Sequence, residues 1–233
     1  YCYARPTHAY RNLSPGLDFE TQIFYKPDGP ALLEATFRKP GYQVEPIVIG
    51  TNTDAYQPAE RRLQLTRALL QIMSDFQHPV SIITKSALIL RDIDLLASLA
   101  ERQLVRVYVS ITTLEPELAR TMEPRAATPA RRLHAVKALT QAGVPTGVMT
   151  APMILGVNDD ELEALLEAAV EAGARSAGYT LMRLPYEVKD LFLSWLRTHR
   201  PEAASRVESL IRSTRGGELN VSAFGERMRG SGP

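Results

Sequence analysis

Short runs of β-branched and aliphatic residues alternate along the chain with longer segments whose apolar residues recur at helical spacing. The short runs are typical of strands buried on both faces, and they lie at residues 44–50, 80–84, 105–111, 146–151 and 177–182. The longer segments predict amphipathic helices, and they lie at about residues 59–75, 92–102, 129–142, 159–172, 188–199 and 202–215.

This alternation predicts an α/β fold with a parallel sheet and outer helices. Five strand–helix units fit an incomplete barrel, and a doubly wound sheet stays open as the alternative because periodicity does not separate the two. Gly143 and Gly173 follow two of the predicted helices, where glycine commonly ends a helix. No linker rich in glycine or serine divides the chain, so we expect residues 1–233 to form one domain with extra C-terminal helices from about residue 187.

The composition indicates a globular protein without a strong charge preference. Its 233 residues are 45% hydrophobic, which is enough to bury one sizeable core. The net charge of +1 gives no overall footprint for nucleic acid, which is neither required nor excluded. No apolar run approaches the length of about 18 residues that a membrane span needs. A single cysteine excludes an internal disulfide and fits a reducing compartment, so we expect a cytoplasmic protein.

Polar residues gather where the predicted strands end, which is where parallel barrels carry their chemistry. The first strand runs into residues 50–54, the second into 84–86 and the third into 110–113. Any one of these residues can instead cap a helix or close a turn, and Asp54 can orient its loop or cap a helix. Together they offer acceptors for an ammonium group, hydroxyls for a ribose and, in Lys85, a cation for a carboxylate.

The only cysteine, Cys2, lies at the start of the chain in the sequence Tyr-Cys-Tyr-Ala-Arg-Pro-Thr-His. A lone cysteine is most often a small buried hydrophobe, and that interpretation stays open. The segment resembles the end of the Cys-x3-Cys-x2-Cys loop of radical S-adenosylmethionine (SAM) enzymes. Within that superfamily it is most similar to the spore photoproduct lyase-like branch, the "DNA repair photolyase" group of uncertain substrate.

The resemblance implies a partial TIM-like (β/α)6 barrel whose first strand and part of the cluster loop are missing from this chain. It also implies a [4Fe-4S] cluster with Cys2 as its third thiolate ligand and two further cysteines upstream of the printed residues. One cysteine cannot hold such a cluster. We therefore expect the chain as printed to lack iron and to be inactive.

The resemblance further implies where SAM would bind. Thr53 would approach its amino group, Lys85 and Ser110 would contact its carboxylate or ribose, and Tyr1 would contact the cofactor beside the cluster loop. Residues 150–159 resemble the family's G-x-I-x-G-x-x-E adenine motif. Backbone near Ala151 and the residue Ile154 would contact adenine.

The adenine motif is imperfect in this chain. Gly156 fits it, but Pro152 replaces its first glycine and Asp159 replaces its glutamate. A strand, a turn and a helix with Asn158 or Asp159 as its N-cap would account for the same residues, and both interpretations can hold together.

The activity implied by the resemblance is reductive cleavage of SAM to a 5′-deoxyadenosyl radical, which takes hydrogen from an unknown substrate. A flavodoxin- or ferredoxin-like protein would supply the electron. In spore photoproduct lyase a cysteine in the segment matching residues 51–54 returns a hydrogen atom, whereas this chain has threonine and asparagine there, which argues against repair of that lesion. Tyr3 is a candidate hydrogen relay, and packing in the core is its alternative role.

Arg183 follows the last predicted strand, where its guanidinium can bind the carboxylate or phosphate of a ligand. An ion pair with Glu187 is the structural alternative. The rival function is a nucleotide- or nucleic-acid-binding barrel without radical chemistry, in which Lys85 and Ser110 bind a phosphate or sugar and Cys2 is incidental. The sequence does not identify the substrate or the oligomeric state.

Overall fold

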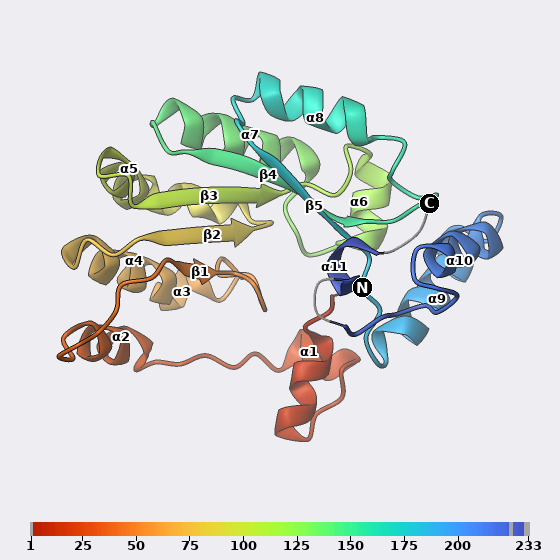
Figure 1. Ribbon diagram of the computed structural model, residues 1–233, viewed down its shortest axis with the longest axis horizontal. Helices are drawn as coiled ribbons and strands as arrows, with labels where there is room; N and C mark the ends of the chain where they lie inside the picture. The colour runs from red at the N-terminus through yellow and green to blue at the C-terminus, as the bar shows by residue number, and fades with distance from the viewer. Residues whose placement is uncertain (1, 224–225, 231–233) are drawn as a thin grey trace.

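A curled parallel sheet with helices packed along its outer face forms the centre of the protein (Figure 1). The computed structural model describes residues 2–223 and 226–230. Each strand pairs in parallel with the next strand of the chain, in the order β1-β2-β3-β4-β5. The strands are β1 (Ile47–Ile49), β2 (Val80–Thr84), β3 (Val105–Ser110), β4 (Thr146–Met153) and β5 (Ala177–Leu181).

The strand order decides between the two predicted architectures. A doubly wound sheet reverses its strand order at a switch point, whereas this order follows the chain throughout. The sheet is therefore a half-barrel, which confirms the partial-barrel prediction and excludes the doubly wound alternative. No helix in the described part of the chain has the length and apolar character needed to cross a membrane.

β1 and β4 differ most in length from their predictions. β1 begins at Ile47 instead of residue 44, because Val44 is exposed and contributes no buried face. β4 continues to Met153, two residues beyond its predicted end, through an irregularity opposite β5 between Thr150 and Met153. The longer β4 carries the backbone of residue 151 into the mouth of the half-barrel.

Most predicted helices are present, and one is divided. The segment predicted as one helix at residues 59–75 forms α3 (Glu60–Leu63) and α4 (Leu65–Asp75), separated by Gln64 in a left-handed conformation. The division follows from the Glu60 carboxylate, which accepts hydrogen bonds from the backbone N–H groups of Leu65 and Thr66 at the start of the second helix. The other predicted helices are α5 (Ile93–Glu101), α7 (Pro129–Gln141), α8 (Leu162–Glu171), α9 (Val188–His199) and α10 (Ala204–Ser213).

Further helices were not predicted. They are short, and those near the N-terminus bury no residue completely. They comprise η1 (Arg5–Arg11), α1 (Leu17–Thr21), α2 (Gly29–Phe37), η2 (Ala87–Asp92), α6 (Pro116–Met122) and α11 (Glu226–Arg229). The N-terminal segment, α9, α10 and α11 gather beyond the C-terminal ends of the strands (Figure 1).

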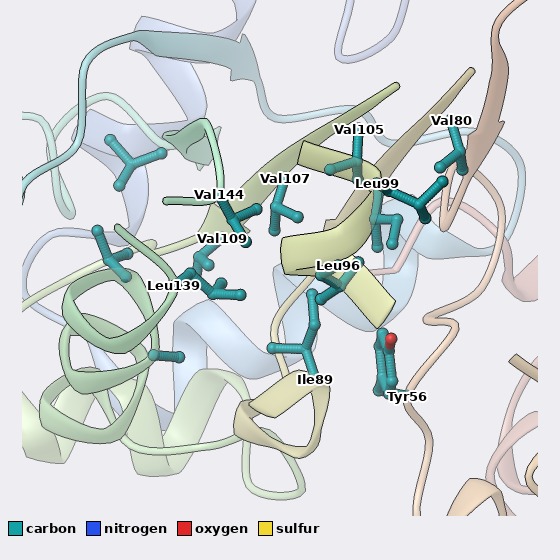
Figure 2. Packing of buried hydrophobic residues seen from close by; sticks show 14 of the residues in the cluster. Tyr56, Val80, Ile89, Leu96, Leu99, Val105, Val107, Val109, Leu139 and Val144 are labelled. Carbon is teal, nitrogen blue, oxygen red and sulfur yellow. The ribbon is translucent and has the colours of Figure 1, made fainter. Parts of the chain in front are cut away.

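Two hydrophobic clusters support the fold. The larger lies between the sheet and the outer helices, where Val107 packs with Leu96 and Leu99 (Figure 2). The smaller includes Ile154 and Phe192 and lies under α9 and α10. The C-terminal helices thus have an apolar core of their own and border the mouth of the half-barrel.

Glycines end two helices as predicted and allow one close approach. Gly143 and Gly173 come directly after Ala142 and Ala172, the C-cap residues of α7 and α8, and both glycines have positive φ angles. Gly50 follows β1 at φ +93°, and a Cβ atom there would lie 2.0 Å from the carbonyl oxygen of Ile83. The chain can therefore turn from β1 into the loop at residues 51–54 only with glycine at this position.

Substitution of Gly50 by alanine is expected to lower the free energy of unfolding by about 2–4 kcal/mol, because it adds a backbone clash to left-handed strain. Gly41→Ala is the matched control: Gly41 also has a positive φ, but nothing lies within 4 Å of its added Cβ. The control should cost only about 1–2 kcal/mol. Urea unfolding measures the free energy of unfolding of both variants. An equal decrease in the two variants would contradict the close approach at Gly50.

Candidate functional site at the ends of the strands

A buried ionic network crosses the mouth of the half-barrel around Glu123, the residue after α6. One Glu123 oxygen accepts a hydrogen bond from the Lys85 ammonium at 2.5 Å. The other accepts from the Thr112 hydroxyl at 2.8 Å and from the Arg132 guanidinium at 2.5 Å. Arg132 also donates to the carbonyl oxygen of Ser110 at 3.0 Å. The network therefore links the ends of β2 and β3 to α7.

Three residues predicted to bind SAM meet at one point of this network. The ammonium of Lys85 donates to the carbonyl oxygen of Ala151 at 3.0 Å, and the Ser110 hydroxyl donates to the same oxygen at 3.3 Å. These residues come from the ends of β2, β3 and β4. Ser110 is buried, whereas 28% of the Lys85 side chain is exposed. A ligand at the mouth can therefore reach Lys85.

The surroundings of the network shift the pKa values of its ionisable groups. Burial, with a smaller contribution from the nearby guanidinium of Arg132, lowers the pKa of Lys85 to about 7. Burial raises the pKa of Glu123, while Arg132 opposes that shift. Both effects arise because charges are held away from water. An anionic ligand that reaches Lys85 would favour its protonated form.

Asp54 fixes the loop at residues 51–54 to the neighbouring strand. One carboxylate oxygen accepts from the Thr84 hydroxyl at 2.7 Å, and the other accepts from the backbone N–H of Lys85 at 2.7 Å. The predicted alternative, in which Asp54 orients its loop, therefore describes the geometry. Thr53 is exposed, and within the described residues its hydroxyl forms no hydrogen bond. The hydroxyl is available to a ligand.

The turn after β4 is closed by the two residues predicted as N-caps. The Asn158 amide accepts from the backbone of Ile154 at 2.7 Å and donates to the carbonyl oxygen of Thr112 at 2.6 Å. Asp159 accepts from the backbone N–H of Gly156 at 2.6 Å. The N-cap prediction is wrong, because the N-cap residue of α8 is Glu161.

Ile154 lies where the predicted adenine motif places it in the sequence, but its side chain is completely buried. It packs in the smaller hydrophobic cluster under α9 and α10. A charged side chain at this position would disrupt the core whether or not a ligand binds. The contacts of Ile154 and of the backbone near Ala151 with adenine stay predictions.

The N-terminal segment lies against the ends of β1 and β5. The Tyr3 hydroxyl donates a hydrogen bond to the carbonyl oxygen of Thr51. The guanidinium carbon of Arg183 lies 4.7 Å from the centre of the Tyr3 ring. Cys2 is half-buried beside this contact. Tyr1, predicted to contact the cofactor, lies outside the described residues.

The ion pair considered as the alternative role of Arg183 is not formed. Among the described residues, Arg183 makes no ion pair with Glu187 or with any other carboxylate. Its contact is the aromatic face of Tyr3. Tyr3 and Arg183, the two residues predicted to take part in catalysis, therefore lie together.

Cys2, the one cysteine of the chain, does not complete an iron–sulfur site by itself. In residues 2–223 and 226–230, no three histidine, cysteine, aspartate or glutamate side chains lie close enough to hold a metal ion. Cys2 offers one thiolate, and clusters of this kind are held by several. A cluster would need further cysteines in addition to the printed residues.

Comparison with known proteins decides the family. The sequence model of the Radical SAM superfamily matches residues 1–169. The chain belongs to the radical SAM superfamily. This membership confirms the resemblance inferred from the residues around Cys2, and the family implies SAM and an iron–sulfur cluster as cofactors.

The related sequences carry no assigned activity. The radical SAM chain is 37% identical over 214 residues to an uncharacterized protein of Mycobacterium tuberculosis, covering 91% of this chain and 63% of that protein. It is 29% identical over 161 residues to an uncharacterized protein of Methanocaldococcus jannaschii, covering 69% of this chain and 58% of that protein. The chain thus spans about three fifths of the length of these relatives.

Solved structures of spore photoproduct lyase share the fold. One, complexed with dinucleoside spore photoproduct, has a TM-score of 0.56 and 16% sequence identity, covering 87% of this chain and 57% of that chain. Another, a mutant with bound AdoMet and the same lesion, has a TM-score of 0.55. At this identity the likeness establishes the half-barrel fold and leaves the substrate of the radical SAM chain open.

Glu123 and Arg132 belong to the site although they were not predicted from the sequence. Arg132 stands at helical spacing with the buried residues Ala135, Val136 and Leu139, so it continues the inward face of α7. A charged residue on an apolar face signals a buried partner. That signal would have indicated Arg132, although nothing in the spacing identifies Glu123 as its partner.

Proposed function

We propose that this radical SAM chain is the core of an enzyme that binds SAM at the C-terminal ends of β1 to β4. The observation that carries the proposal is the meeting of Lys85 and Ser110 at the carbonyl oxygen of Ala151. It places a cation, a hydroxyl and a backbone acceptor together where parallel barrels bind their ligands. A zwitterion with a ribose needs all three kinds of group.

Each residue has a distinct part in this proposal. Lys85 binds the SAM carboxylate. Glu123, which is bound to Arg132, positions the ammonium group of Lys85. Thr53 binds the amino group on a loop that Asp54 holds in place. Backbone near Ala151 contacts the adenine.

The enzyme would use SAM as a source of a 5′-deoxyadenosyl radical that takes hydrogen from its substrate. The family's iron–sulfur cluster supplies the electron for that cleavage when bound, and Cys2 would be one of its ligands. We propose a flavodoxin- or ferredoxin-like reductant and a cytoplasmic location. Tyr3 and Arg183 lie together beside Cys2 and would face the substrate.

Repair of spore photoproduct is not the activity we propose. The chain has one cysteine, Cys2, and the residues of the loop after β1 are threonine, asparagine and aspartate. The alcohol O–H bond of threonine is too strong to replace a thiol as a hydrogen donor.

The test is anaerobic reconstitution of the full-length protein with iron and sulfide, followed by dithionite and SAM. We expect about four irons per chain and formation of 5′-deoxyadenosine. Cys2→Ser is the control, and it should abolish both the binding of iron and the formation of 5′-deoxyadenosine. SAM binding without iron or cleavage would reject the proposal and favour the nucleotide-binding barrel.

A further inference from the structure

Two arginines, Arg183 and Arg215, lie at the C-terminal end of β5. Arg183 follows the strand at the mouth, and Arg215 follows α10. Arg215 is 2% exposed and donates to the carbonyl oxygen of Met182, the residue before Arg183, at 2.6 Å. In the part of the chain that the structure describes, neither arginine forms an ion pair with a carboxylate.

Arg183 retains its hydrogen-bonding capacity. Its guanidinium packs against the ring of Tyr3, and among the described residues none of its N–H groups donates a hydrogen bond. A guanidinium carries five donors in a planar fork, which suits the oxygens of a carboxylate or phosphate. Arg183 is only half-buried, so an anion can reach these donors.

The guanidinium groups near the end of β5 repel one another. Burial lowers the pKa of Arg183, and the guanidinium of Arg227 on α11 lowers it further. Burial also lowers the pKa of Arg215, with Arg183 adding to the shift. Since α11 packs against β5, a third cationic residue borders the same place (Figure 1). Partly desolvated cations that repel one another favour the arrival of an anion.

We propose that Arg183, held in position beside Arg215, binds a phosphate or carboxylate group of the substrate. The assignment to substrate rests on the proposed function, in which Lys85 already binds the SAM carboxylate. The contact with Tyr3 places this anion subsite next to Cys2. The substrate would then carry an oxyanion at a fixed position relative to the carbon that loses hydrogen.

The experiment titrates the full chain with inorganic phosphate, and separately with acetate, by isothermal titration calorimetry. Sodium chloride keeps the ionic strength constant. Arg183→Gln is expected to weaken oxyanion binding about tenfold or more, and Arg183→Lys, which keeps the charge without the fork, should lose less. The matched control is Arg197→Gln, which removes an exposed arginine of α9 and should leave binding unchanged. Stronger binding of phosphate would indicate a phosphorylated substrate, and stronger binding of acetate a carboxylated one.

A thermal unfolding series separates anion binding from a purely structural role. In chloride, Arg183→Gln should unfold at the same temperature as the unchanged protein or higher, because it removes a repelled cation. In phosphate, the unfolding temperature of the unchanged protein should rise more than that of the variant, because a ligand stabilises the state that binds it. Equal anion binding by both proteins would overturn the proposal, as would displacement of phosphate by SAM. Neither titration requires iron, so failure to form 5′-deoxyadenosine would reject the proposed function without affecting this result.

Discussion

Replacement of Lys85 by methionine is expected to weaken SAM binding by about 10- to 100-fold, the effect of losing a hydrogen bond to a charged group. Methionine keeps most of the length of the side chain but carries no charge. Glu123 would keep its bonds to Arg132 and Thr112, so the fold should persist. Isothermal titration calorimetry of SAM against the full-length protein measures the change.

The matched control is Lys137→Met, which removes an exposed lysine from α7. It should bind SAM as tightly as the unchanged protein does. Circular dichroism establishes that both variants are folded. Unchanged affinity in the Lys85 variant would remove the central contact of the proposed SAM site.

Replacement of Arg132 by methionine is expected to lower the free energy of unfolding by about 3–5 kcal/mol, because the buried carboxylate of Glu123 then loses its guanidinium partner. Glu123 is only 3% exposed in its side chain, so water cannot replace the guanidinium. The variant also leaves the carbonyl oxygens of Ala127 and Ser110 without the donor they have now. Urea unfolding measures the loss.

The neighbouring residue provides the control for this prediction. Arg131 is exposed, and Arg131→Met should change the free energy of unfolding by no more than about 0.5 kcal/mol. Adding Glu123→Gln to the Arg132 variant should recover part of the loss, because the buried charge that has lost its guanidinium partner is then removed. Similar stability for the Arg131 and Arg132 variants would show that the buried ion pair does not stabilise the fold.

Much of the sheet was predictable because buried parallel strands are continuous apolar runs. β2 has the predicted bounds, and β3 and β5 end one residue earlier than predicted. β1 was predicted to begin too early, because Val44 is exposed despite its β-branched side chain. The break between α3 and α4 depends on one carboxylate, which propensity does not encode.

The site was predictable where it depends on strand ends. Lys85, Ser110 and Ala151 lie together because neighbouring parallel strands end at the same edge of the sheet. The network behind them was not predictable, since Glu123 meets Lys85 only through the path of the chain after α6. The N-terminal helices were missed because they are short and half-exposed.

The contacts of Lys85 also affect the entropy of binding. A free lysine side chain has about 2 kcal/mol of rotamer entropy to lose when it is fixed. Because Glu123 and the carbonyl oxygen of Ala151 already hold the ammonium, much of that loss occurs when the protein folds. A carboxylate that binds to the folded protein then contacts an ammonium group that is already ordered. The order acquired during folding therefore increases the affinity of Lys85 for the carboxylate.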